Sequence, residues 1–393
     1  MKNYHKLINN FMVFCPPVVF LSYVIYWGLY NYMHPYMTDF TTMWIVAKLS
    51  ISNQLNVLSN QLLLQNTIES ITGIKLQTSF MYPPSFTMIL SPLGYLSYFP
   101  SLLIWIFITF IGYFIVSYYI NQNKASLLLM LAFPGTLINI GAGQNGFLTA
   151  TFLGGGLLML EKYPILSGIF FGLLTYKIHM VVLVPIALIC GRCWKTIISM
   201  VITFITLVII TLIMFGSETW KYFIDGLMFG SKMLESGVSG QIIAYAKMTT
   251  VYAGLKSLNC GSLISTIIQS IIMVGCIILV TIVWLRKNCL QIKSIILMLA
   301  ILLFTPYAYG YDLTILGLVI LQIDKIYCPN ELIIKRNILL SIAYVSPILT
   351  LSKINSWGLQ IIPLVLLSLL VWCWYEHSCR LPVKEKVVQH RLP

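Results

Sequence analysis

Charged residues are scarce in this 393-residue chain, and acidic residues are the scarcest of them. Only 9% of the residues are charged, 24 Lys+Arg against 11 Asp+Glu, whereas 59% are hydrophobic. Soluble globular domains carry roughly 25% charged residues. So few charges cannot cover a soluble protein of this length, which excludes a soluble enzyme or a disordered chain. The net charge of +13 does not indicate a nucleic-acid binder, because the long apolar stretches instead predict many membrane spans.

Patterned cysteines, metal-ligand clusters and nucleotide-binding motifs are also lacking. The nine cysteines are scattered and odd in number, so a disulfide framework is not expected. Cys190 and Cys193 form one Cys-x-x-Cys pair, but no second pair or nearby His completes a zinc site. The sequence has no Gly-rich phosphate loop, no Ser/His/Asp grouping and no internal repeat. We therefore expect no cofactor, and short inner loops disfavour an ATP-driven transporter.

Apolar runs of about 20 residues, or fewer where helices are buried among others, predict the transmembrane segments. The first run, Phe11 to Tyr30, follows a basic start like a signal peptide but has no small-residue cleavage site, so we predict a retained span. Residues 164–192 are predicted to form a hairpin of two short spans that turns near Lys177. The apolar piece 84–98 is interpreted as a partly inserted or broken element, although a full crossing would reverse all later orientations. The other predicted spans are 101–120, 126–140, 146–160, 196–215, 262–285, 293–306, 311–323, 337–352 and 357–375.

These segments predict an all-α, polytopic integral membrane protein with about 12 transmembrane helices in one domain, residues 1–393. With both termini cytoplasmic, the inner side holds 16 of the 24 basic residues and 5 of the 11 acidic ones, including a basic tail, 376–393. Two long loops, 31–83 and 216–260, then lie outside. The first has leucines among Asn, Gln and Ser, a pattern that suits amphipathic helices on the membrane surface. We therefore expect the chemistry at the outer, periplasmic face of the inner (plasma) membrane.

Ionisable residues at membrane depth are costly, which makes them functional candidates. Asp39 follows the first span, and a helix is predicted over 41–50. A helix cap by Thr38 or Asp39 is the alternative interpretation. Lys177, together with His179, lies between two apolar runs and is placed to bind a phosphate at the outer membrane edge. The alternative for Lys177 is a side chain that snorkels to the interface.

Amides and aromatic side chains provide further candidates. Gln144 and Asn145 lie in a Gly-rich stretch that either forms a tight turn between spans or presents amides to a sugar. Tyr82 precedes two prolines that start an apolar helix, and it is also a candidate aromatic platform. Tyr311 and Asp312 define an outer mouth together with neighbouring tyrosines, although tyrosines favour membrane interfaces in any case.

Taken in order, five motifs resemble glycosyltransferase family 87, a group of polyprenyl-phosphate-sugar-dependent, mannosyltransferase-like integral membrane enzymes. The resemblance covers roughly residues 20–320, and its Gln-Asn-Gly and Leu-Thr-Tyr-Lys blocks are the most specific. The chain departs from the family pattern at Ile178, where Pro is usual, and at Tyr311-Asp312, where one branch is rich in His. The motifs are Asp39-Phe40, Tyr82-Pro83-Pro84, Gly143 to Ala150, Gly168-x-x-x-Gly172 through Lys177, and Thr305-Pro306-Tyr307 through Leu313.

The resemblance implies a GT-C fold, no metal, and a hexose donor, by the family's default mannose, on a polyprenyl monophosphate. It also implies that Asp39 activates the acceptor hydroxyl. The acceptor is expected to be a cell-envelope glycan or glycolipid, and a single displacement inverts the anomeric configuration. The chemistry then assigns Lys177 to the donor phosphate, with His179 assisting. The expected sugar- or acceptor-binding residues are Tyr82, Gln144, Asn145, Tyr311 and Asp312.

Two other functions fit the same composition. A lipid or sugar transporter, or flippase, would use rare intramembrane charges along its pathway without bond chemistry. Such proteins usually show inverted repeats, and none is evident here. A non-catalytic scaffold subunit is the second rival, but it has no need of Asp39, Gln144 and Lys177 on one side of the membrane.

Overall fold

The computed structural model describes residues 2–76, 78–236, 245, 247–326, 330–351 and 360–375. Within these residues the chain is helical, apart from an isolated antiparallel bridge between Met248 and Tyr309. The prediction of an all-α fold is therefore confirmed for this part of the chain. The predicted basic tail, 376–393, lies outside the described residues, as do positions 237–244 and 246 of the second predicted outer loop.

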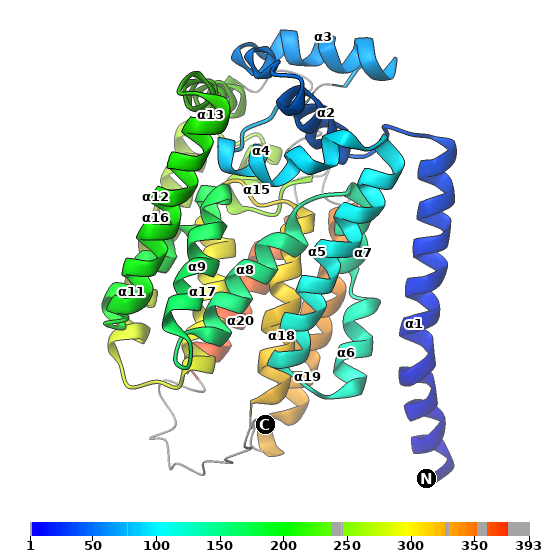
Figure 1. Cartoon of the computed structure of the whole chain (residues 1–393). Coiled ribbons are helices and arrows are strands. Elements are labelled where there is room, and N and C mark those ends of the chain that lie inside the picture. Colours follow the sequence, from blue (N-terminus) through cyan, green and yellow to red (C-terminus); the bar gives the residue numbers. More distant parts are fainter. Residues whose placement is uncertain are drawn as a thin grey trace.

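One end of the helix bundle is covered by short helices, and we call it the α2 end (Figure 1). The chain reaches it through α1 (Lys2–Met33), which contains the predicted first span. The first predicted outer loop then forms helices, as expected from its leucines. The helices within this loop are α2 (Phe40–Ile51), η1 (Leu55–Ser59) and α3 (Gln61–Thr72), and α4 (Pro84–Leu90) and η2 (Ser91–Tyr95) follow it.

The ambiguous segment 84–98 does not cross the bundle. It is broken into α4 and η2, and both pack against α2. Its far end returns to the start of α2, because the Tyr98 hydroxyl lies 2.8 Å from Thr38 Oγ1. The interpretation as a broken element is correct, and the later spans keep their predicted order.

The next helices run back and forth along the bundle. The predicted span 126–140 is split in two, because Pro134 disfavours the helical conformation of the preceding Phe133, whose ψ is 125°. The predicted hairpin reverses near Lys177, as expected (Figure 1). These elements are α5 (Tyr98–Ile120), α6 (Lys124–Leu131), α7 (Pro134–Ala142), α8 (Gly146–Met159), α9 (Pro164–Leu173), η3 (Leu174–Lys177), α10 (Ile178–Val181), α11 (Leu183–Cys190) and α12 (Trp194–Phe215).

The Gly168-x-x-x-Gly172 motif brings α9 and α12 together. A Cβ on Gly168 would collide with Ser199, and one on Gly172 would collide with Thr203. Small residues spaced by four let membrane helices approach closely, because association there depends on van der Waals packing. The motif therefore fixes the position of α9 against α12, and α9 leads directly into the turn that contains Lys177.

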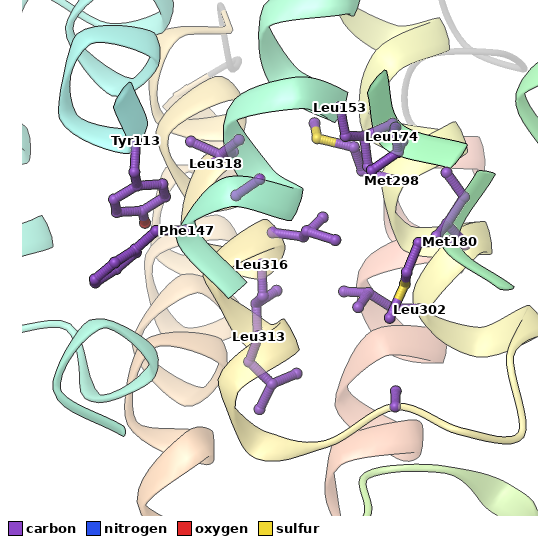
Figure 2. Close-up of a cluster of buried hydrophobic side chains, with 14 of the residues drawn as sticks. Tyr113, Phe147, Leu153, Leu174, Met180, Met298, Leu302, Leu313, Leu316 and Leu318 are labelled. Atoms are coloured by element: carbon purple, nitrogen blue, oxygen red, sulfur yellow. The ribbon is translucent and has the colours of Figure 1, made fainter. Parts of the chain in front are cut away.

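The remaining helices supply the core and its membrane-facing surface. α17 and α18 are buried along most of their length, with Met298 beside Leu153 and Leu174 and Leu318 on the side of Tyr113 (Figure 2). A helix that is hydrophobic on all sides is typical of such a central position. The elements are α13 (Glu218–Ser236), α15 (Val251–Ser257), α16 (Ser262–Leu285), α17 (Leu290–Phe304), η4 (Gly310–Leu313), α18 (Thr314–Lys325), α19 (Asn330–Val345), η5 (Ser346–Leu351) and α20 (Ile362–Trp374).

Exposed apolar side chains on the outer helices identify a membrane protein. Ile213 on α12 is 80% exposed and Leu263 on α16 is 74% exposed. Among the described residues, six helices are long and apolar enough to cross a membrane. Shorter apolar helices such as α8, α17 and α20 lie between them. The predicted total of about 12 spans and the GT-C fold stay predictions.

The two ends of the bundle differ in charge. At the end opposite α2, Asn121 donates to the Asp324 carboxylate, and Lys293 lies over the Trp284 ring. Residues predicted to be inner therefore gather there, while Asp39, Lys177 and Asp312 lie toward the α2 end. Which end faces the cytoplasm stays a prediction from the positive-inside rule. The described basic residues at or near the helix ends on that side are Lys124, Lys162, Arg192, Lys195, Arg286, Lys287, Lys293, Lys325, Lys335 and Arg336.

Candidate active site

The loop between α1 and α2 holds Asp39 in place through its neighbours. Thr38 Oγ1 lies 2.8 Å from the Tyr98 hydroxyl, and the Tyr36 ring packs 4.7 Å from the Tyr98 ring. Asp39 occupies the N-cap position of α2, but its side chain accepts no hydrogen bond from the helix. Because Thr38 is also engaged elsewhere, neither side chain caps α2. The Asp39 carboxylate is therefore left for another role.

The surroundings of Asp39 favour a carboxylate of raised basicity. Its side chain contacts solvent and accepts a hydrogen bond from Gln144 Nε2 at 3.4 Å. Neighbouring protein removes part of its hydration, which raises the pKa of Asp39 above its ordinary value of 3.8. The positive charge of Lys247 and the Gln144 amide act in the opposite direction. A proton acceptor of this kind gains basicity while still reaching solvent.

Two glycines allow the loop between α7 and α8 to approach both α2 and η4. Gly143 has a φ of +65°, and a Cβ there would lie 2.8 Å from the Phe40 Cβ. A Cβ on Gly146 would collide with the backbone carbonyl of Tyr311. Asn139 fixes the loop further, because its Oδ1 accepts the Gly146 N–H at 2.8 Å. The predicted turn is therefore confirmed, and its amides contact Asp39 and Lys177. Their presentation to a sugar stays a prediction.

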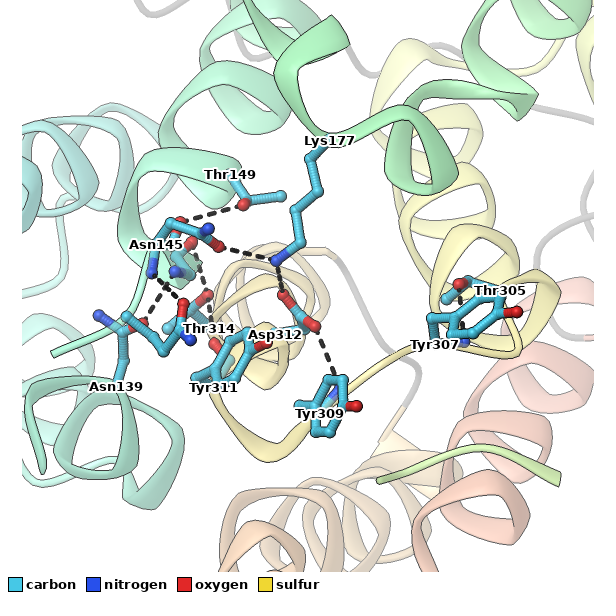
Figure 3. A network of polar contacts seen from close by, with 12 residues as sticks. Asn139, Asn145, Thr149, Lys177, Thr305, Tyr307, Tyr309, Tyr311, Asp312 and Thr314 are labelled. Atoms are coloured by element: carbon cyan, nitrogen blue, oxygen red, sulfur yellow. Dashed lines mark hydrogen bonds and ion pairs between the residues drawn. The ribbon is translucent and has the colours of Figure 1, made fainter. Parts of the chain in front are cut away.

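Lys177 is buried in an ion pair at the point where the chain reverses. Its side chain is 1% exposed, and Nζ lies 2.5 Å from Asp312 Oδ1. Nζ also donates to Asn145 Oδ1 at 2.8 Å and lies 5.0 Å from the centre of the Tyr311 ring (Figure 3). Lys177 therefore does not snorkel to the interface. The sequence predicted that Lys177, Asn145 and Asp312 lie on the same side of the membrane. It did not predict that they contact one another.

Asp312 joins Lys177 to the segment that precedes η4. Its Oδ2 accepts the Tyr309 N–H at 3.1 Å, while its Oδ1 contacts Lys177. Asp312 is fully buried, so both oxygens need these partners. The Tyr309 and Tyr311 rings stack 5.5 Å apart (Figure 3). Burial, with the negative charges of Asp312 and Asp39 nearby, raises the pKa of Tyr309 to about 12, so its hydroxyl stays neutral.

An aromatic column supports the other side of the site. The Tyr82 ring packs 4.5 Å from Phe86, and Phe86 stacks 4.8 Å from Tyr176. The Tyr176 hydroxyl lies 2.6 Å from Thr149 Oγ1 and donates to the Asn145 carbonyl at 3.2 Å. Tyr82 itself lies beside Asn145. Tyr82 thus borders the site, and its role as an aromatic platform stays a prediction.

His179 stands next to this network with an unused nitrogen. Its Nε2 is buried and has no hydrogen-bond partner among the described residues. Its ring lies 6.4 Å from the Tyr307 ring. A buried polar atom without a partner is unusual in a folded protein and often marks a place for a ligand or water.

The structure brings the predicted residues into two adjoining groups. Asp39 and Gln144 form one group, and Lys177, Asn145 and Asp312 form the other, with the loop 143–146 between them. Sequence reasoning included Tyr309 only among the tyrosines of the outer mouth, and it missed Lys247, Asn139 and Tyr176. Tyr176 lies inside the Leu-Thr-Tyr-Lys block, which was a usable signal, but the Asn139 and Lys247 positions carry no pattern.

Comparisons with known proteins identify the family. The family model described as Glycosyltransferase family 87 matches residues 80–306, more than half of the chain. This match includes Tyr82, Gln144, Asn145, Lys177 and His179, whereas the other predicted site residues lie outside it. Comparison with curated proteins and with solved structures gave no match. On the strength of the family match and the membrane helices, the chain belongs to glycosyltransferase family 87 and is a membrane glycosyltransferase.

Proposed function

We propose that this glycosyltransferase moves a hexose, by family precedent mannose, from a polyprenyl-phosphate donor to a cell-envelope glycan or glycolipid. The observation that carries the proposal is the Asp39 carboxylate. It is free of its helix, reaches solvent, and lies beside Gln144 at the same end of the bundle as the buried Lys177. The reaction then takes place at the outer face of the plasma membrane, where the α2 end is predicted to lie.

Asp39 acts as the general base. An acceptor hydroxyl within hydrogen-bond reach transfers its proton to the carboxylate while its oxygen bonds to the anomeric carbon of the sugar. The bond between that carbon and the phosphate oxygen breaks, and its electron pair leaves with polyprenyl phosphate. General base catalysis contributes roughly 10²–10⁴-fold in rate. Because displacement occurs in one step, a β-linked donor gives an α-linked product.

Lys177 and His179 are assigned to the donor phosphate. A phosphate leaving group needs charge stabilisation more than protonation, and a fixed cation in a water-poor site supplies it. The unpartnered His179 Nε2, in the tautomer that carries its proton there, is a further donor to the phosphate oxygens. Gln144, Asn145, Tyr82 and Tyr311 border the proposed sugar position. Asp312 keeps Lys177 oriented, and a contact to a sugar hydroxyl stays a prediction.

The decisive experiment is sugar transfer by the purified protein in lipid nanodiscs. Radiolabelled polyprenyl-phosphate mannose is incubated with a lipid extract from the cell envelope, and the labelled product is separated by chromatography. Asp39→Asn should lose transfer by at least 10²-fold. Asp225→Asn is the matched control, because Asp225 is an exposed carboxylate on α13 at the same end. Equal rates for the wild type and Asp39→Asn would refute the role of Asp39 as base.

The same purified protein, reconstituted into sealed lipid vesicles, tests the transporter alternative. Labelled donor is placed on one side of a sealed vesicle, and both its position and its chemical state are followed. Movement across the bilayer without cleavage of the sugar–phosphate bond would support a flippase and contradict the proposed transfer.

A further inference from the structure

The charges of the candidate site do not balance those of the proposed donor. Lys177 is already neutralised by Asp312 at 2.5 Å, and Asp39 adds a negative charge. A sugar on polyprenyl phosphate is a phosphodiester with one negative charge, and the departing monoester carries about −1.5 to −2 at pH 7. An anion entering this site therefore needs a cation that no carboxylate already pairs.

Lys247 is placed to be that cation. Its neighbour Met248 forms the antiparallel bridge with Tyr309, and the Thr249 N–H donates to the Ala308 carbonyl at 2.8 Å. The segment that carries Lys247 therefore runs alongside the one that leads into Asp312. The sequence separation from Asp312 is large, so only the tertiary structure brings the two segments together.

The residues that follow Lys247 are anchored by hydrogen bonds, whereas its own side chain reaches solvent. Met248 and Thr249 are buried, whereas the Lys247 side chain is exposed. Before it, the Tyr245 carbonyl accepts a hydrogen bond from Gln360 Nε2 at 3.2 Å. After it, Thr250 Oγ1 caps α15 by accepting the Ala253 N–H at 3.2 Å. A long cationic side chain on a rigid base can reach a bound anion without reordering the loop.

Two other lysines at the α2 end have contacts of their own. Lys48 donates to the Gly94 carbonyl at 3.4 Å and lies over the Trp44 ring. Lys256 donates to Ser262 Oγ at 2.8 Å. Lys247 forms no ion pair with any acidic residue in the described part of the chain, and its charge acts on Asp39. It thus combines an unpaired charge with proximity to the proposed base.

We infer that Lys247 binds the phosphate of the polyprenyl donor and stabilises the phosphate as it leaves. The inference rests on the proposed function and adds a residue to its site. Lys177, held by Asp312 and Asn145, forms the buried side of the phosphate position, and Lys247 closes it from the solvent side. As the bond between the anomeric carbon and the phosphate oxygen breaks, the added negative charge on that oxygen is met by the Lys247 ammonium.

Binding of a short polyprenyl phosphate tests this inference directly. Farnesyl phosphate and farnesol are titrated into the full-length protein in detergent micelles, with heat as the readout. Lys247→Ala should weaken farnesyl phosphate about 10–100-fold, the range for loss of a charge-assisted hydrogen bond. Lys247→Arg should stay within a few-fold of the wild type, and Lys247→Glu should bind more weakly than Lys247→Ala. Farnesol binding should not change in any variant.

Lys221→Ala is the matched control, because Lys221 is exposed on α13 at the same end. An unchanged affinity of Lys247→Ala for farnesyl phosphate would overturn the inference and leave the proposed function standing. If Lys247→Ala changed only the pH profile of transfer, the inference would also be overturned. Lys247 would then act only on the pKa of Asp39, whose other ionisable neighbours include Tyr82, Tyr309 and Tyr311. If the wild type binds farnesyl phosphate no more tightly than farnesol, the phosphate donor itself is refuted, and the inference falls with it.

Discussion

Breaking the buried ion pair between Lys177 and Asp312 should have a large and asymmetric effect on stability. Asp312→Asn keeps the shape of the side chain but leaves the Lys177 ammonium, 1% exposed, without a counter-ion. Removal of one partner of a buried pair costs about 3–5 kcal/mol. Lys177→Met should lower the free energy of unfolding by a similar amount, because it leaves Asp312 unpaired. It should cost about 1–3 kcal/mol more, because Asn145 Oδ1 also loses its donor. Equilibrium unfolding of the protein in mixed micelles, followed by tryptophan fluorescence, measures these losses.

A double variant separates stability from function. Replacing Lys177 by Met and Asp312 by Leu together removes both charges, and buried pairs replaced by apolar residues often fold as well as the original. We expect the double variant to be more stable than either single variant, so the changes are not additive. It should nevertheless lose sugar transfer, because the cation is gone.

Asp324→Asn supplies the control for the charge change itself. Asp324 accepts hydrogen bonds from Asn121 and Ser126 at 3.1 and 2.7 Å, and no cation pairs with it among the described residues. Its replacement should lower the free energy of unfolding by only about 1 kcal/mol, because the donors to Asp324 are neutral side chains. If Asp312→Asn were no more destabilising than Asp324→Asn, the reasoning about a buried, charged pair would be refuted.

Three further predictions concern Asp39 and the loop that faces it. Transfer should require ionised Asp39, so kcat/KM should fall as the pH drops through its raised pKa; a rate independent of pH down to 4 would contradict this. Gln144→Ala removes a hydrogen bond that lowers this pKa, so the acid limb of the profile should move to higher pH, and an unmoved limb would argue against the contact. Gly143→Ala should cost about 1–2 kcal/mol from its positive φ and lower the transfer rate by displacing Gln144, which unfolding and transfer assays of one preparation would check.

Local patterns in the sequence were sufficient for the fold class. Apolar runs and scarce charges predicted a helical membrane protein, because each span must be apolar over its own length whatever it packs against. Leucines among polar residues predicted helices in the first outer loop, which the structure contains. The break at Pro134 within the predicted span 126–140 was not predicted. The motifs around Gln144 and Lys177 likewise indicated the family, which the family match confirmed.

Only the tertiary structure decided how the site residues pair. Lys177 and Asp312 are 135 positions apart, and nothing in either local sequence predicts that one neutralises the other. The sequence also left open whether Asp39 caps α2. The structure shows no capping hydrogen bond from Asp39, whose carboxylate accepts one from Gln144 instead. No sequence pattern marked Lys247, because its position depends on the backbone bridge between the neighbouring Met248 and Tyr309. Hydropathy is a property of each segment alone, whereas charge pairing depends on which segments the packed bundle brings together, and so the sequence determined the membrane helices while the packing determined the site.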